Sequence, residues 1–423
     1  MSFTGQSFAS LAITAFYAII ALAISVLSAR LMPLAEYGLY ASVMGHVLIL
    51  TALTSGMPGY LVREVTTADH EGETGVLAGL IRRSVHLILV ATILVAVSAW
   101  LIWLSGNGDP RWWEGFAIGV GIFTAFGLIN ALGAILRGLG LPVIGQIPAS
   151  IVRPVLQLVV LVGITSFVPL NGNLALIILL CASLAALLVA SNMLRNVLAG
   201  RAQAGPIYRD RVWLIGMATF GLATGFQRIN QHLATVTLQQ IGTVEQVGLF
   251  QPAVEALLVM GLPTLAIMAI LMPHLRKAFL DKDQAIQQSL LDRAHRITFF
   301  CAVFLAGLFW LLGGAGIAAI FGPAFSAAFP AIAIIALGQV AAAALGNPLA
   351  VLIQTDQERT AAKVLIGVAA LNLVLLIILI PGLGIEGAAI ATSLSIIAGR
   401  LVMALHCNRA LGLRTWLWPL AHR

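Results

Sequence analysis

Twelve long apolar segments, joined by short loops, occupy almost the whole of this 423-residue chain. The hydrocarbon core of a bilayer is about 30 Å thick, and an α-helix needs about 20 apolar residues to cross it. The composition agrees, with 60% hydrophobic residues, 9% charged residues and a mean hydropathy of +1.01. These values exclude a soluble globular domain and predict an all-α polytopic membrane protein.

The apolar segments predict twelve transmembrane helices. Their expected ranges are 8–30, 39–61, 85–105, 114–136, 148–168, 174–195, 212–238, 246–272, 297–318, 326–353, 364–381 and 385–406. A transmembrane β-barrel would instead show strands of about ten residues with alternating apolar and polar positions. Continuous apolar runs such as Leu87–Val97 and Leu371–Ile380 exclude that architecture.

Lysine and arginine fall almost entirely in every second loop. One set of loops and tails holds 19 of the 23 basic residues, including Arg137 and Arg153, whereas the opposite set holds only Arg30 and Arg111. Basic residues are retained on the cytoplasmic side, so both termini are expected in the cytoplasm. The segment before the first helix has no basic residue, which predicts a retained helix rather than a signal peptide. The net charge of +7 reflects this sidedness and does not indicate nucleic-acid binding.

The chain is expected to consist of two six-helix lobes. A loop over Asn196–Arg211 separates the sixth helix from the seventh, which predicts lobes at 1–205 and 206–423. Short motifs recur in the same order in both halves, such as Gly56–Pro58 and Gly261–Pro263. Because each half has an even number of helices, the halves would be parallel repeats that transport by alternating access around a central cavity.

Four stretches carry a family resemblance. They are Ala29–Tyr40, Gly56–Glu64, Thr355–Lys363 and Ile380–Thr392. Together with the helix count and loop placement, they resemble the polysaccharide transporters of the multidrug/oligosaccharidyl-lipid/polysaccharide (MOP) exporter superfamily, which include the O-antigen (Wzx-type) flippases. The resemblance rests on structural motifs rather than on chemical ones.

This resemblance implies a MATE-like fold, with a V-shaped pair of lobes around a cationic cavity. It implies a flippase of the bacterial inner membrane that moves polyprenyl-diphosphate-linked oligosaccharide between leaflets. Membrane lipids and the polysaccharide polymerase machinery are further expected partners. An ion-coupled multidrug or small-solute exporter of the same superfamily is the alternative. Multidrug relatives often carry an acidic residue in the first helix, and Ser10–Arg30 contains none.

Polar residues inside predicted helices indicate where a substrate would bind. The seventh helix is the richest in them, and polar groups at membrane depth tend to face protein or water. The substrate-binding candidates are Thr224, Gln227, Arg228, Gln231 and His232. Arg228 would bind a diphosphate or an acidic sugar, because its planar donor fork suits phosphate.

Glu255 of the eighth helix is a candidate for ion coupling. Arg228 and Glu255 are each expected about 15 Å deep, where they can meet. A structural ion pair between these two residues is the competing interpretation. Tyr17 and His46 are further cavity candidates, and Arg400 and Arg30 are expected to extend toward the interface.

Enzyme classes find little support in the sequence. No phosphate-binding G-x-x-x-x-G-K-[S/T] loop is present, and no outer loop is long enough for a catalytic site. Three unclustered cysteines indicate neither disulfides nor a metal site. The basic signature of major-facilitator symporters is missing from Thr66–Arg83. We therefore expect a transporter without catalytic residues, metal or cofactor.

Overall fold

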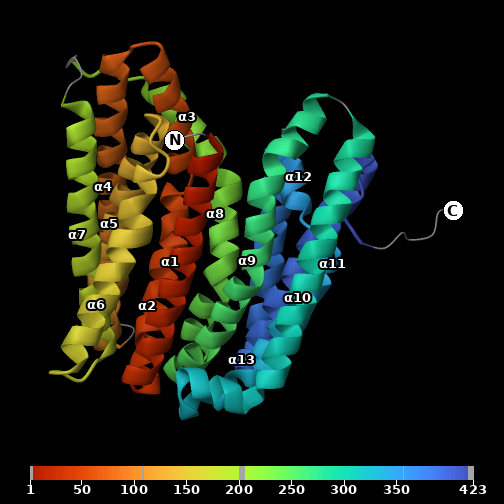
Figure 1. The fold of residues 1–423 in the computed structure, drawn as a ribbon. Helices are drawn as coiled ribbons and strands as arrows, with labels where there is room; N and C mark the ends of the chain where they lie inside the picture. The colour runs from red at the N-terminus through yellow and green to blue at the C-terminus, as the bar shows by residue number, and fades with distance from the viewer. Residues whose placement is uncertain (1–2, 107–108, 200–204, 282, 356, 418–423) are drawn as a thin grey trace. The chain divides into compact units, whose positions relative to one another are not determined.

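A computed structural model describes residues 3–106, 109–199, 205–281, 283–355 and 357–417, and every regular element within these ranges is helical (Figure 1). Ten described helical segments are long and apolar enough to cross a membrane. A further helix, α8 (Asp210–Ile241), carries the polar residues of the seventh predicted helix. A break at Gly384 divides α13 (Glu358–Leu411) into two spans. The described helices thus account for the twelve predicted crossings.

The chain divides into two compact units, Met1–Ile229 and Asn230–Arg423. The division falls inside α8, whereas the sequence places a lobe boundary at 205/206, in the loop before that helix. That lobe boundary stays a prediction. Three basic residues used for orientation, Arg201, Lys282 and Arg423, lie outside the described residues.

Unit 1 is built around α5. Its elements are α1 (Phe3–Leu31), α2 (Leu34–Leu50), the 3₁₀ turn η1 (Thr51–Thr54), α3 (Gly56–His70), α4 (Thr74–Leu104), α5 (Pro110–Gly138), the 3₁₀ turn η2 (Ile144–Gln146), the π-helical turn η3 (Pro148–Val152), α6 (Arg153–Thr165), α7 (Gly172–Leu198) and the first part of α8. Helix α5 packs against α2, α3, α4 and α7. Gly115 and Gly119 allow close approach to α2, because a Cβ atom at either position would press on Val43.

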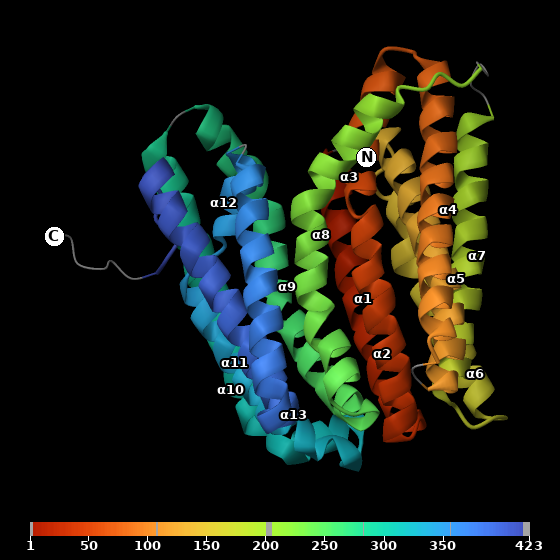
Figure 2. The same ribbon diagram turned by 180° about the vertical axis from the view of Figure 1, so that it is seen from behind.

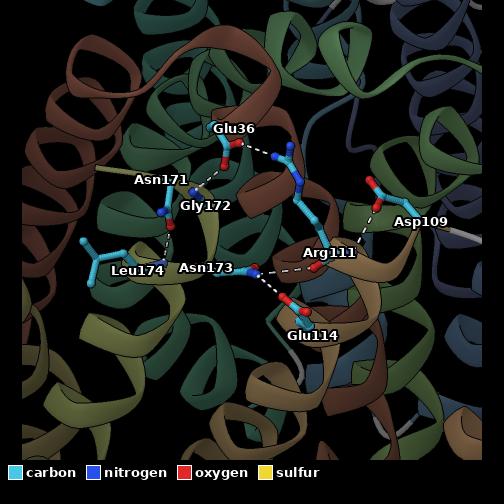
Figure 3. Close-up of polar contacts among 8 residues, drawn as sticks. All are labelled: Glu36, Asp109, Arg111, Glu114, Asn171, Gly172, Asn173 and Leu174. Carbon is cyan, nitrogen blue, oxygen red and sulfur yellow. Dashed lines mark hydrogen bonds and ion pairs between the residues drawn. The ribbon is translucent and has the colours of Figure 1, made fainter. Parts of the chain in front are cut away.

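A polar network joins the starts of α5 and α7 to α2 (Figure 3). One carboxylate oxygen of Glu36 pairs with the Arg111 guanidinium at 2.9 Å, and the other accepts the Gly172 backbone N–H at 2.9 Å. Asp109 caps α5 and Asn171 caps α7, each by accepting a backbone N–H from the first turn. The network satisfies helix-terminal donors that a bilayer cannot satisfy.

The opposite end of unit 1 fixes the start of α8 against α4. Arg83 pairs with Asp210, and Arg209 pairs with Glu73 at 2.8 Å. The segment before α8 also bonds to α4, where the Ile207 N–H donates to a backbone carbonyl at 2.9 Å. These contacts attach the start of α8 to α4 of unit 1, at the end where the sequence places most basic residues.

Unit 2 repeats the packing pattern of unit 1 (Figure 2). It contains the rest of α8, α9 (Val244–Leu280), α10 (Gln284–Phe321), the 3₁₀ turn η4 (Pro323–Ala328), α11 (Phe329–Ala344), α12 (Pro348–Gln354) and α13. Helix α11 packs against α9, α10 and α13, as α5 packs against its neighbours in unit 1. The fourth span is central in both units, which agrees with the predicted internal repeat.

One predicted helix of unit 2 is divided in the structure. The sequence predicts one helix over 326–353, but α11 ends at Ala344 and α12 begins at Pro348. That prediction is wrong because Pro348 lacks the N–H that would continue the ladder, and Gly346 adopts a positive φ of 73°. The break at Gly384, with φ 54°, separates the two halves of α13 where the sequence expects a loop.

Candidate substrate site

The polar residues of α8 follow a helical period. Thr224, Gln227, Arg228 and Gln231 are exposed, and their spacing of three and four residues places them on one face. His232 is half-buried. Thr224, Gln227 and Arg228 belong to unit 1, whereas Gln231 and His232 belong to unit 2 with Glu255. Three of the predicted site residues, Thr224, Gln227 and Arg228, therefore lie on one face of the part of α8 that belongs to unit 1.

Thr224 attaches α8 to the junction between η1 and α3. Its hydroxyl donates to the Phe220 carbonyl at 2.9 Å and to the Ser55 hydroxyl at 3.3 Å. Ser55 in turn lies 3.4 Å from the Gly221 carbonyl. A hydroxyl that is engaged in this way positions the helix, and Arg228, one turn further along α8, extends from a fixed support.

Tyr17 is the centre of a cationic cluster in unit 1. It lies midway along α1, and the Arg153 guanidinium donates to its hydroxyl at 3.3 Å. The guanidinium carbon of Arg153 lies 5.8 Å from the Tyr17 ring centroid and 4.3 Å from that of Phe126. Such distances are those of cation–π contacts. Arg228 lies within electrostatic range of Tyr17. Helices α1, α5 and α6 thus bring Arg153, Tyr17 and Phe126 into contact, and α8 adds a second cation within electrostatic range.

The position of Arg153 is a finding that sequence reasoning missed. The loop pattern of the sequence places it among the cytoplasmic basic residues, but it follows the turns η2 and η3 and lies half-buried beside the middle of α1. The π-helical turn Pro148–Val152 precedes it, and turns of this kind are frequent at functional sites. A detectable signal was present, because Arg153 lies inside an apolar segment between two prolines, Pro148 and Pro154.

The cluster carries positive charge without a neutralising carboxylate. In the part of the chain that the structure describes, Arg153 contacts Tyr17 and Phe126, and neither Arg153 nor Arg228 forms an ion pair with a carboxylate. Removing a guanidinium from water is costly unless it is paired. Arg153 is half-buried, and Arg228 is exposed but lies inside a predicted membrane crossing, so a bound anion would offset the charge of both.

The other predicted residues take separate places. Glu255 accepts a hydrogen bond from Gln251 at 3.3 Å within α9, and its proposed meeting with Arg228 stays a prediction. His46 lies against the Trp112 ring, with centroids 5.0 Å apart, near the start of α5 and away from Tyr17. Among the described residues, no group of three histidine, cysteine or acidic side chains could hold a metal ion.

Arg400 does not extend toward the interface as we expected. Its guanidinium donates to the carbonyls of Ala342 and Gly346, at 2.9 and 3.0 Å. The Ala342 carbonyl lies in the last turn of α11, where it also accepts the Leu345 N–H at 3.2 Å, and the Gly346 carbonyl lies in the break between α11 and α12. The expectation is wrong because a local acceptor pair is available at the helix break, so the side chain turns into unit 2.

Comparison with known proteins was made at the levels of sequence and structure. No protein-family model matches the chain, and no curated protein sequence matches it. Solved structures do. An inward-facing multidrug-resistance MATE family transporter of the MOP superfamily superposes with a TM-score of 0.74 and 15% identity, covering 96% of this chain and 98% of that one. The lipid II flippase MurJ, in an inward closed conformation, gives 0.76 and 16%, covering 94% and 86%.

A third similar structure is a MOP superfamily transporter from Pyrococcus furiosus. It is described by a binding pocket of reverse polarity that suggests a different function. Its TM-score is 0.70 at 15% identity, and the match covers 96% of this chain and 94% of that one. Similarity at this level of identity concerns the fold. The chain is a multi-pass membrane protein with the fold of the MOP superfamily transporters.

Proposed function

We propose that this protein is a flippase for polyprenyl-diphosphate-linked oligosaccharide, such as an O-antigen or exopolysaccharide repeat unit. It would act in the bacterial cytoplasmic membrane with both termini in the cytoplasm. The substrate would move from the inner to the outer leaflet by alternating access between the two six-helix lobes. The fold supports a transporter, and the choice of an anionic substrate rests on the cluster around Tyr17.

The observation that carries this proposal is Arg153 in contact with Tyr17, with Arg228 within electrostatic range and no carboxylate paired with either arginine in the described part of the chain. A diphosphate offers several acceptor oxygens, and two guanidinium forks can bind them with charge-assisted hydrogen bonds. An aromatic ring on the same site can contact a sugar face while the Tyr17 hydroxyl bonds to a sugar hydroxyl. A cationic drug would instead meet repulsion at this cluster, which disfavours the multidrug alternative.

The test is the lipid-linked glycan pool of a deletion strain. The strain is complemented with the wild-type protein, Arg153→Ala, Arg228→Ala or the control Arg82→Ala, which removes an exposed arginine of α4. We expect polyprenyl-linked oligosaccharide to accumulate in the deletion strain. The wild-type and Arg82→Ala proteins should clear it, whereas both site variants should fail at normal protein levels. Clearance by both site variants, or no accumulation at all, would refute the proposal.

Glu255 is proposed to couple transport to an ion. If its carboxylate carries a proton, Glu255→Gln should remove the dependence of transport on a proton gradient in proteoliposomes. Gln251→Ala is the matched control, because it removes the hydrogen bond to the carboxylate and leaves its charge. Gradient-dependent transport at the wild-type rate by Glu255→Gln would exclude this role.

A further inference from the structure

Unit 1 contains an apolar cavity of about 420 Å³ that is separate from the cluster around Tyr17. Its walls come from η1, α3, α4 and α8. Apart from Thr54, the lining residues are apolar or glycine. Leu53 and Leu222 at its edge are 66% and 47% exposed, so the cavity opens to the surface of the protein. Its size and lining are those of a site for a small apolar group.

The cavity exists because two helices meet through glycines. Helix α3 begins at Gly56, whose position would place a Cβ atom on the backbone of Gly221 in α8. Gly225, one turn further, lies against Ser55 and Ala52, where an added Cβ atom would be 3.2 Å from the Ser55 hydroxyl and 3.3 Å from the Ala52 carbonyl. The backbones are close, and the missing side chains leave a recess above them. Hydrogen bonds of Ser55 with Gly221 and Thr224 connect the start of α3 to α8 at this point, so the contact does not depend on apolar side chains in the recess.

The recess lies next to the cationic site on α8. Met217 and Gly221 line the cavity, and Thr224 and Arg228 follow them at a spacing of seven residues, which places all four along one side of α8. A ligand that fills the cavity and reaches Arg228 must therefore carry an anionic group and an apolar chain close together. A polyprenyl diphosphate has this structure at the junction of its head and tail.

The depth of the charged group favours this chain over a phospholipid acyl chain. Arg228 is expected about 15 Å deep in the membrane. Leu87 and Leu214, which line the cavity, lie nearer to the end of the helices where Arg83 pairs with Asp210. A phospholipid keeps its head group at the interface, whereas a diphosphate bound at Arg228 would place the first isoprene units at the inner end of the cavity.

We infer that the cavity between η1, α3, α4 and α8 holds the first part of the substrate's polyprenyl chain while the arginines hold its diphosphate. The inference rests on the proposed function and adds a tail site to it. Ala91 of α4 and Ala218 of α8 line opposite walls, so a phenylalanine at either position would fill the cavity. Ala96→Phe is the matched control, because Ala96 is an exposed residue of α4 outside the lining.

The test is photo-crosslinking of the full chain in vesicles of phosphatidylethanolamine and phosphatidylglycerol. One probe is polyprenyl diphosphate with a diazirine near the head-group end of its chain, and the other is phosphatidylethanolamine with a diazirine on an acyl chain. We expect the polyprenyl probe to label peptides that contain Leu87–Ala91 and Leu214–Ile229. Ala91→Phe and Ala218→Phe should each reduce that labelling about tenfold, as filling a pocket does. Ala96→Phe should leave it unchanged.

Three outcomes would overturn the inference. Equal labelling of the cavity by the phosphatidylethanolamine probe would identify the occupant as bulk lipid. Polyprenyl labelling of α1 and α6 without labelling of the cavity would exclude the tail site and leave the proposed function standing. No polyprenyl labelling of any part of the chain would remove the proposed function and the tail site together.

Discussion

Glu36 should contribute more to the stability of unit 1 than Arg111, although the two form an ion pair. The Arg111 side chain is 68% exposed and that of Glu36 is 22% exposed. Exposed ion pairs contribute about 0.2–1 kcal/mol, so Arg111→Ala should cost about 0.5 kcal/mol. Glu36 also accepts the first N–H of α7, through Gly172 at 2.9 Å. Losing a cap costs about 1 kcal/mol, and losing a negative charge near a helix N-terminus costs about 0.3–1 kcal/mol.

Glu36→Ala should therefore cost about 2 kcal/mol, and Glu36→Gln about half of that, because glutamine keeps the acceptor and loses the charge. The free energy of unfolding can be measured in mixed micelles by titration with a denaturing detergent. Intrinsic tryptophan fluorescence reports the transition, and Trp112, whose indole N–H donates to Ser42 at 3.0 Å near the network, contributes to it. Glu71→Ala, at an exposed turn, is the control and should change the free energy by less than about 0.5 kcal/mol.

The relative losses in the free energy of unfolding distinguish the contribution of the cap from that of the ion pair. If Arg111→Ala costs as much as Glu36→Ala, the ion pair and not the cap dominates, and the reasoning is refuted. If Glu36→Gln costs as much as Glu36→Ala, the carboxylate charge rather than the hydrogen bond to Gly172 carries the effect. A double variant of Glu36 and Arg111 measures the coupling between them, which should be below about 1 kcal/mol.

Two further substitutions test packing and a buried charge. Gly133→Val should lower the melting temperature strongly or prevent folding, because a Cβ atom at Gly133 overlaps the Gly145 carbonyl. The control is Gly163→Ala on α6, where the added methyl group meets open space and should stabilise the protein by up to about 1 kcal/mol. Normal stability of Gly133→Val would contradict the packing of α5 on η2. Arg400→Met should cost about 1.5–3 kcal/mol in a detergent unfolding titration, since it removes the charged donor to the carbonyls of Ala342 and Gly346. Arg409→Met, at an exposed position, should be nearly neutral, and equal costs would argue against an inward-facing Arg400.

Periodic features of the sequence were sufficient for much of the fold. Apolar runs of membrane length predicted the crossings, and the structure differs mainly where helices extend beyond the apolar core, as α9 does to Leu280. The polar face of α8 was also predictable, because Thr224, Gln227 and Arg228 recur at helical spacing. Predictions failed at backbone breaks such as the one before Pro348. There a glycine and a proline act together, and an apolar run continues through both.

The sequence by itself determined that the chain crosses a membrane many times and that α8 carries polar groups, because length and hydropathy act on each segment independently. Only the tertiary structure decided which charges meet. Tyr17 and Arg153 are separated by 136 residues, and no local pattern links them. Their meeting depends on the π-helical turn before α6 and on the packing of α1 beside it. The contacts of Arg400 likewise depend on tertiary structure, because its acceptors, the carbonyls of Ala342 and Gly346, lie at the break after α11. In an apolar medium each guanidinium must find a partner, and the fold decides which partner is within reach.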